Sequence, residues 1–120
     1  MSETDVKLAI TKALEAAGYI VTRTAASGYR GRMKGAKKGT PDLHVIGFGG
    51  RSVWLEVKAT EKDKPTKEQL DFFDAARSAG AYAAVVRTPD EAHFHVHSAS
   101  GMSHPFDWTT DGEGNDYPTD

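Results

Sequence analysis

Two apolar segments joined by a glycine-rich turn constrain the fold more than any other feature of the sequence. Residues 42–48 (DLHVIGF) and 52–59 (SVWLEVKA) are rich in β-branched and aromatic residues, and Gly49-Gly50-Arg51 lies between them. Glycine adopts the positive φ angles that tight hairpin turns require. The sequence therefore predicts an antiparallel β-hairpin, which needs further elements to bury its apolar face.

Helical and alternating periodicities on either side of the hairpin predict those further elements. They are a helix over 5–17, a strand over 19–24, a helix over 67–79 and an interior strand over 81–87. Residues 89–97 begin like a helix and then alternate, so a short helix and an edge strand both remain open. The predicted fold class is α/β, with a mixed central sheet flanked by helices in the order α-β-β-β-α-β.

Composition places the chain among ordinary soluble domains. Its 120 residues suit one domain, and it has no cysteine, which excludes a disulfide framework and a thiolate metal site. No apolar run approaches the roughly 18 residues of a membrane helix. Charged residues interrupt the N-terminus, where a signal peptide would be apolar. We expect a cytoplasmic protein with no membrane partner.

Charge is distributed unevenly along the chain. The formal net charge is −2, but residues 101–120 carry five acidic residues and no basic ones, which leaves the first 100 residues at +3. The last segment is also rich in Gly, Asp, Thr and Pro, a composition typical of irregular chain. We predict a single domain over 1–100 and an acidic, irregular tail over 101–120.

Two carboxylates and a lysine make the hairpin the candidate site. Asp42 opens the first strand, and Glu56 and Lys58 share one face of the second, because residues i and i+2 of a strand point the same way. Two carboxylates at one point repel each other unless a cation joins them. Mg²⁺ (or Mn²⁺) prefers such oxygen ligands, and a lysine beside it suits phosphodiester hydrolysis. The alternative is a surface hairpin with charged residues on its solvent face.

A basic, glycine-rich segment lies directly before this hairpin. Residues 25–40 show little periodicity, which predicts a long loop. Its positive charge suits contacts with nucleic-acid phosphates. The basic residues concerned are Arg30, Arg32, Lys34, Lys37 and Lys38. The alternative is a solvated loop with no role in binding.

Together these residues resemble the PD-(D/E)xK nuclease superfamily and, within it, a stand-alone VRR-NUC domain of the phage or bacterial type. The matching residues are Gly39-Thr40-Pro41-Asp42, Glu56-Val57-Lys58 and Gln69. The resemblance covers about residues 2–90. It implies a restriction-endonuclease-like core.

The resemblance also implies roles for individual residues. The implied catalytic residues are Asp42, Glu56, Lys58 and Gln69. The implied metal ligands are Asp42, Glu56, the main-chain carbonyl of Val57 and, as an accessory carboxylate, Glu3. Lys58 would assist the attacking water. Two alternatives stay open: Gln69 could serve only in a capping box with Thr66, and Glu3 only as a favourable charge at a helix N-terminus.

The implied function is a Mg²⁺- or Mn²⁺-dependent endonuclease that hydrolyses the phosphodiester bonds of DNA without a covalent intermediate. The expected substrates are branched structures such as four-way (Holliday) junctions, whose two-fold symmetry favours a homodimer. The alternatives are a restriction-like or RNA-cutting nuclease of the same superfamily, a non-catalytic nucleic-acid-binding module, and a small interaction protein that acts through its acidic tail.

Histidines and aromatic residues supply further candidates. His93, His95 and His97 would share a face of a strand, but the outer two would then lie roughly 13 Å apart, too far for one Zn²⁺. His44 shares the face of Asp42 and could either contact phosphate or fill space. Some aromatic residues have no evident place in the core and would either form a dimer interface or cover the core locally. They are Phe72 or Phe73, Phe94, Phe106 and Trp108.

Overall fold

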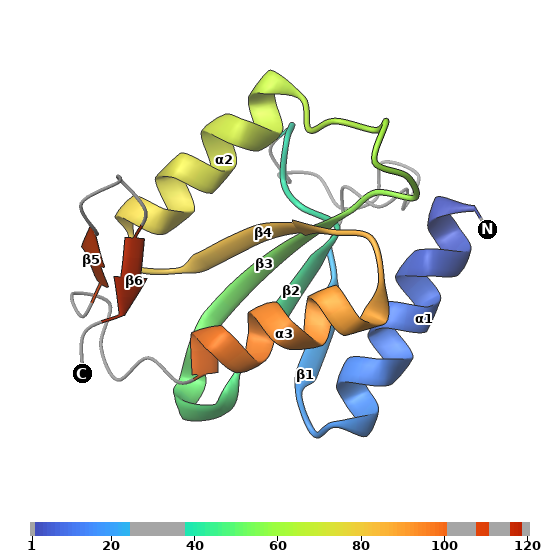
Figure 1. The fold of residues 1–120 in the computed structure, drawn as a ribbon, viewed down its shortest axis with the longest axis horizontal. Coiled ribbons are helices and arrows are strands. Elements are labelled where there is room, and N and C mark those ends of the chain that lie inside the picture. The colour runs from blue at the N-terminus through green and yellow to red at the C-terminus, as the bar shows by residue number, and fades with distance from the viewer. Residues whose placement is uncertain (1, 25–37, 101–107, 111–115, 119–120) are drawn as a thin grey trace.

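A four-stranded mixed sheet with helices on both faces forms the body of the protein (Figure 1). The computed structural model describes residues 2–24, 38–100, 108–110 and 116–118. The elements of the body are α1 (Glu3–Ala16), β1 (Ile20–Arg23), β2 (Leu43–Ile46), the 3₁₀ turn η2 (Phe48–Gly50), β3 (Ser52–Val57), α2 (Lys67–Ser78), β4 (Tyr82–Val86) and α3 (Pro89–Ser100). The predicted α/β fold and its order α-β-β-β-α-β are confirmed, with one helix added after β4.

The register of the hairpin places the two candidate carboxylates, Asp42 and Glu56, opposite each other. The strands lie in the order β1-β2-β3-β4, with β1–β2 and β2–β3 antiparallel and β3–β4 parallel. Leu43 pairs with Leu55, so one further step of the same register places Asp42 opposite Glu56. The turn is longer than predicted, because the strands already end at Ile46 and begin again at Ser52.

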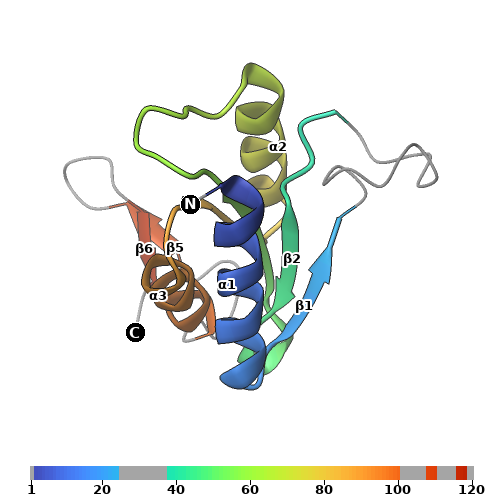
Figure 2. The ribbon, with the colours of Figure 1, turned by 90° about the vertical axis from the view of Figure 1, so that its right-hand side faces the viewer.

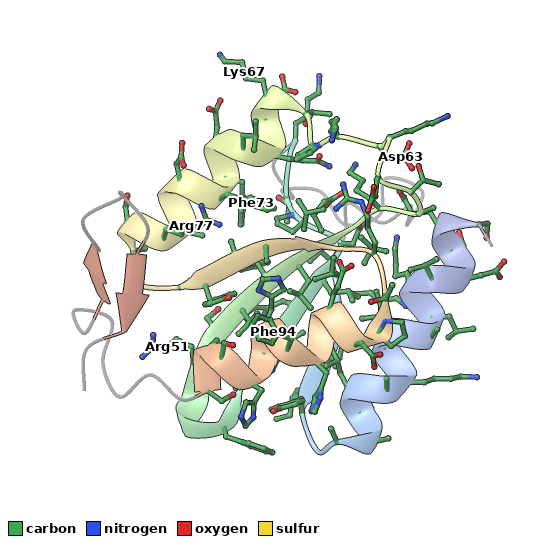
Figure 3. The ribbon with its side chains drawn as sticks, viewed as in Figure 1. Arg51, Asp63, Lys67, Phe73, Arg77 and Phe94 are labelled. Carbon is green, nitrogen blue, oxygen red and sulfur yellow. The ribbon has the colours of Figure 1, made fainter. Side chains whose placement is uncertain are left out.

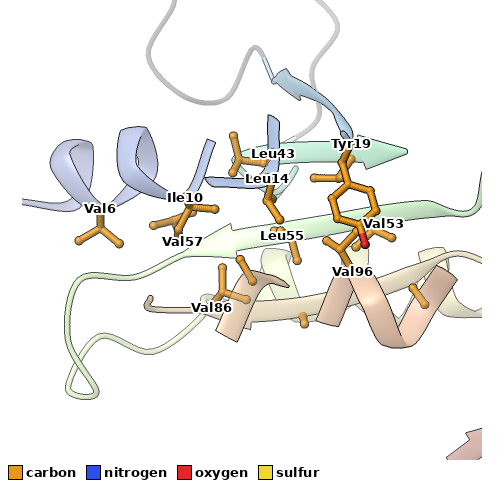
Figure 4. Close-up of a cluster of buried hydrophobic side chains, with 14 residues drawn as sticks. Val6, Ile10, Leu14, Tyr19, Leu43, Val53, Leu55, Val57, Val86 and Val96 are labelled. Carbon is orange, nitrogen blue, oxygen red and sulfur yellow. The ribbon is translucent and has the colours of Figure 1, made fainter. Parts of the chain in front are cut away.

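The hydrophobic core lies between the sheet and the pair of helices α1 and α3, which pack side by side (Figure 2). Alternate residues of β3 point into it, and Val53, Leu55 and Val57 are completely buried. Figure 4 shows these side chains against Ile10 of α1 and Val96 of α3. Each fully buried side chain of this size contributes about 1.5–3 kcal/mol. This face of the sheet therefore supplies the main support for the site on the other face.

Strand β4 corrects one prediction about the sheet. Its apolar sequence was interpreted as an interior strand, but it lies at the edge of the four-stranded sheet. Its residues are apolar because helices cover both faces: Val86 packs in the core with α3, and Ala83 is buried on the face that α2 covers. Phe73, which is buried, points from α2 toward this face (Figure 3).

Residues 89–97 form a helix, so the edge-strand alternative is wrong. Helix α3 begins after Thr88, whose Oγ1 accepts a hydrogen bond from the Glu91 N–H at 3.1 Å. Its buried residues are Ala92, Val96 and Ala99, a helical spacing. The three histidines therefore share no strand face. His93 and His97 lie one turn apart, and His95 instead bonds the Tyr82 hydroxyl through Nδ1 at 2.8 Å.

Part of the C-terminal segment also forms strands. Within residues 101–120, where the sequence predicted irregular structure, β5 (Trp108–Thr110) and β6 (Asp116–Pro118) form a separate antiparallel pair. Phe106 lies outside the described residues, and the division into a domain and a tail stays a prediction. Every helix in the described ranges is too short or too polar to cross a membrane.

Candidate active site

Asp42 and Glu56 are the buried charged side chains of the described residues, with 8% and 3% of their surface exposed. Asp42 directly precedes β2, and Glu56 is the second-last residue of β3. A buried carboxylate loses its hydration, which is costly unless cations or hydrogen-bond donors replace the lost water. The contacts of each carboxylate therefore show which groups replace its lost hydration.

Asp42 is held by contacts from β3, from α1 and from the residue that follows β1. Its Oδ2 accepts a hydrogen bond from the main-chain N–H of Val57 at 2.9 Å, and its Oδ1 lies 3.2 Å from the Nζ of Lys7 on α1. Its main-chain oxygen accepts a hydrogen bond from the N–H of Thr24 at 3.0 Å, and the Thr24 hydroxyl donates to the carbonyl of Pro41 at 2.6 Å. The backbone and the side chain of Asp42 are thus both fixed.

Glu56 is held through one oxygen only. Its Oε2 accepts a hydrogen bond from Gln69 Nε2 at 2.8 Å and lies 3.2 Å from Lys58 Nζ. Its Oε1 is buried and has no hydrogen-bond partner among the described residues. A buried acceptor without a partner typically costs about 1–3 kcal/mol. In its ionised form, Glu56 therefore carries one oxygen that no described residue satisfies, and only the protonated form can share a hydrogen bond with Asp42.

The surroundings of Glu56 favour its protonated form. Burial is the main cause, and the negative charge of Asp42 adds to it, so the pKa of Glu56 is raised from 4.5 to about 7 even though Lys58 acts in the opposite direction. A carboxylate with such a pKa binds a proton near neutral pH in the absence of another cation. A divalent ion would compete directly with that proton.

Gln69 forms the predicted capping box and also contacts Glu56, while its catalytic role stays a prediction. Its side-chain Oε1 accepts a hydrogen bond from the main-chain N–H of Thr66 at 2.9 Å. Its main-chain N–H donates to the Thr66 hydroxyl at 3.2 Å, which completes a capping box. Its Nε2 simultaneously donates to Glu56. The N-terminus of α2 is thereby fixed to the site by the same side chain that caps it.

Gly39 allows the chain to enter the site along that helix. Its φ is +92°, and a Cβ at this position would lie 2.4 Å from the main-chain oxygen of Glu68 in the first turn of α2. A side chain is thus excluded both by conformation and by contact. The segment leading to Asp42 and the helix turn carrying Gln69 therefore pack directly against each other.

The other predicted site residues belong to α1, to β2 and to the basic segment before Asp42. Glu3 is exposed in the first turn of α1, a favourable position for a negative charge at a helix N-terminus. His44 bonds Ser52 Oγ through Nε2 at 2.6 Å and stacks on Trp54, and burial lowers its pKa. Lys38 is exposed. The remaining basic residues lie outside the described ranges: they are Arg30, Arg32, Lys34 and Lys37.

The described residues fit a divalent ion that binds through few protein ligands. They contain no group of three or more His, Asp or Glu side chains placed to hold an ion. Mg²⁺, however, commonly binds through one or two carboxylates together with water and phosphate. Glu56 Oε1, which is buried and unbonded, and the neighbouring Asp42 form such a pair. The assignment of individual site residues stays a prediction.

Two residues that contact the site were not identified from the sequence. Lys7 follows the buried Val6 on α1, and nothing in the helical periodicity distinguishes it from a solvent-facing lysine. Thr24 directly follows β1, where its alternation with Thr22 only indicates a strand. Their proximity to Asp42 depends on how α1 and β1 pack against β2, so a local pattern carries no signal for it.

Comparison with known proteins identifies the family. A solved structure described as a "VRR_NUC domain" is 30% identical to this chain, with a TM-score of 0.60, and the match covers 79% of this chain and 94% of that one. The chain belongs to the VRR-NUC domain family. A second structure, described as a "VRR_NUC domain protein", has a TM-score of 0.63 at 17% identity and covers 82% of this chain and 88% of that one, which shows a shared fold. No family model and no curated protein matches the sequence.

Membership of the VRR-NUC family makes this a nuclease-family domain. The resemblance inferred from Asp42, Glu56-Val57-Lys58 and Gln69 is thereby confirmed at the level of the family. These residues of the VRR-NUC domain lie together at one end of the sheet, where β2 begins and β3 ends.

Proposed function

We propose that this VRR-NUC domain is a Mg²⁺- or Mn²⁺-dependent endonuclease that cuts branched DNA, such as four-way (Holliday) junctions. The observation that carries the proposal is the buried, unbonded Oε1 of Glu56 beside Asp42, in a chain of a nuclease family. Burying an acceptor without a partner costs stability, whereas an unbonded carboxylate oxygen is available to bind a divalent ion.

The chain's own residues would divide the work of hydrolysis. Asp42, Glu56 and the main-chain carbonyl of Val57 would hold the ion, which when bound supplies Lewis-acid stabilisation of the phosphate and activates water. The Val57 N–H already fixes one oxygen of Asp42. In an extended strand, the carbonyl of a residue points to the same side as its N–H, which here is the side of Asp42.

Lys58 and Gln69 would both act on the Glu56 carboxylate. Both contact Glu56 Oε2, so they leave Oε1 available and keep the carboxylate in one orientation. The Lys58 ammonium, 3.2 Å from Glu56 Oε2, would orient the attacking water and stabilise negative charge that develops on the phosphate. No covalent enzyme intermediate is required.

DNA binding would use the basic loop, and assembly would use exposed apolar residues. The basic residues of the loop before Asp42 would contact the phosphate backbone, and a homodimer would place two sites on a two-fold symmetric junction. Phe94, with 66% of its surface exposed, and Ile20, with 61%, are available for an interface. Phe72 is a weaker candidate than the sequence suggested, because its ring packs edge-on against Trp54.

Cleavage of matched DNA substrates tests the proposal. We expect a four-way junction to be cut faster than flap, splayed and linear duplex DNA with Mg²⁺ or Mn²⁺, and no cleavage with chelator. Asp42→Asn should lower the rate at least about 10²-fold, since it removes a ligand charge. Asp74→Asn, on the exposed side of α2, is the matched control and should cleave like the wild type.

Several outcomes would contradict parts of this proposal. Full activity of a folded Asp42→Asn variant would exclude the metal-site assignment. Equal cleavage of junction and linear duplex would exclude the branch preference. Light scattering at micromolar protein measures the mass directly, and a strict monomer would exclude the homodimer.

A further inference from the structure

Lys7 brings a second lysine to the carboxylate pair from an element outside the hairpin. Its Nζ lies 3.2 Å from Asp42 Oδ1, and only 12% of its side chain and 11% of that of Asp42 are exposed. It follows Val6, which is buried in the core, so the position of its backbone is fixed by the packing of α1. The pair is therefore a partly buried, directional contact and differs from an exposed surface ion pair.

The two lysines neutralise the two carboxylates separately. Lys7 pairs with Asp42 and Lys58 with Glu56. The other oxygen of Asp42 is already bonded to the Val57 N–H, so Oδ1 is the oxygen through which Asp42 would reach an added ion. An ammonium and a divalent cation on the same oxygen repel each other strongly in a poorly hydrated site. A divalent ion that binds through Oδ1 would therefore compete with the Lys7 ammonium for the same oxygen.

We propose that Lys7 is a positioning residue that competes with the divalent ion for Asp42. In the ion-free protein its ammonium holds the aspartate in place and offsets the repulsion between the two carboxylates. When an ion binds, this ammonium gives up Oδ1, so Lys7 raises the divalent-ion concentration at which the site fills. The inference rests on the proposed metal-dependent function. It adds that Lys7 lowers the affinity of the site for the ion.

Calorimetric titration of the DNA-free protein with Mn²⁺ tests this role without relying on activity. We expect Lys7→Met, which retains an unbranched side chain but lacks the charge, to bind Mn²⁺ about tenfold more tightly than the wild type. Lys12→Met removes the same charge from an exposed position of α1 and should bind within about twofold of the wild type. Lys7→Arg restores a cation and should return the affinity toward that of the wild type.

The outcomes separate this inference from the proposed function. If the wild type binds Mn²⁺ and Lys7→Met binds it equally or more weakly, Lys7 is not a competitor, while the metal site stands. If neither the wild type nor any Lys7 variant binds Mn²⁺, the proposed metal site itself is contradicted. Should Lys7→Met fail to fold, Lys7→Gln keeps an N–H donor for Asp42 Oδ1 without the charge, and the same tighter binding is expected.

Discussion

The two faces of β3 differ in how well their buried groups are satisfied. On one face, Leu55 and Val57 have no exposed surface and pack among the side chains of α1 and α3. On the other, Glu56 is 3% exposed, lies beside a second carboxylate and has one oxygen with no partner in the described structure. Alternate residues of one strand thus experience opposite environments.

This difference indicates how a small domain combines stability with chemistry. Strand alternation places successive side chains on opposite faces, so the same six residues of β3 can stabilise the fold and present the site. The apolar face contributes free energy of folding, and the charged face consumes part of it. Substitutions on the apolar face should therefore lower the free energy of unfolding at any pH, whereas the contribution of Glu56 on the charged face should depend on pH and on a bound ion.

The largest expected change comes from the apolar face. Leu55→Ala removes a fully buried side chain and leaves a cavity beneath the site, so the free energy of unfolding should fall by about 2–5 kcal/mol. Urea denaturation followed by circular dichroism measures the change. A loss below about 1 kcal/mol would show that the core under β3 is loosely packed. It would then contradict the contrast drawn between the apolar and the charged face of β3.

A smaller change is expected where the charged face meets α2. Gly39→Ala introduces a Cβ against the backbone of Glu68 at a φ of +92°, and the free energy of unfolding should fall by about 2 kcal/mol or more. Gly49→Ala is the matched control, because its φ is +84° but a Cβ there meets nothing within 4 Å. Its cost should be limited to about 1–2 kcal/mol of backbone strain. Equal losses for both variants would show that the contact with α2 contributes nothing.

The sequence predicted the charged face better than the helices around it. The hairpin turn and the strand period together determine which residues face each other, so the proximity of Asp42 and Glu56 followed from local patterns. The capping box placed Gln69 in the first turn of α2, whereas its role beside Glu56 came only from the family resemblance. The site's remaining contacts join elements distant in sequence, and Lys7 was therefore missed.

The errors elsewhere also have physical causes. The histidines of residues 93–97 alternate with period two, and this masked the weaker helical signal of the small residues Ala92 and Ala99, which are buried in α3. Strand β4 was assigned to the sheet interior because it is apolar on both faces. An edge strand covered by helices on both faces has the same composition as an interior strand, so sequence alone does not distinguish them.

The central claim is that Glu56 is kept as a buried carboxylate for a divalent ion at a cost in stability. In chelator, a raised folded-state pKa means that the folded protein binds a proton more tightly than the unfolded chain. This contribution to stability is complete below pH 4.5 and is lost as the pH rises through about 7. The loss should be on the order of 2 kcal/mol.

The free energy of unfolding of the wild type and of Glu56→Gln, measured at pH 5 and pH 8 with and without Mg²⁺, tests this claim most directly. The wild type should lose stability between pH 5 and pH 8 in chelator and regain it with saturating Mg²⁺. Glu56→Gln should lack both the pH dependence of this group and the response to Mg²⁺, whereas Glu61→Gln, an exposed control, should retain both. A Mg²⁺ response of Glu56→Gln equal to that of the wild type would contradict the assignment of Glu56 to the metal site.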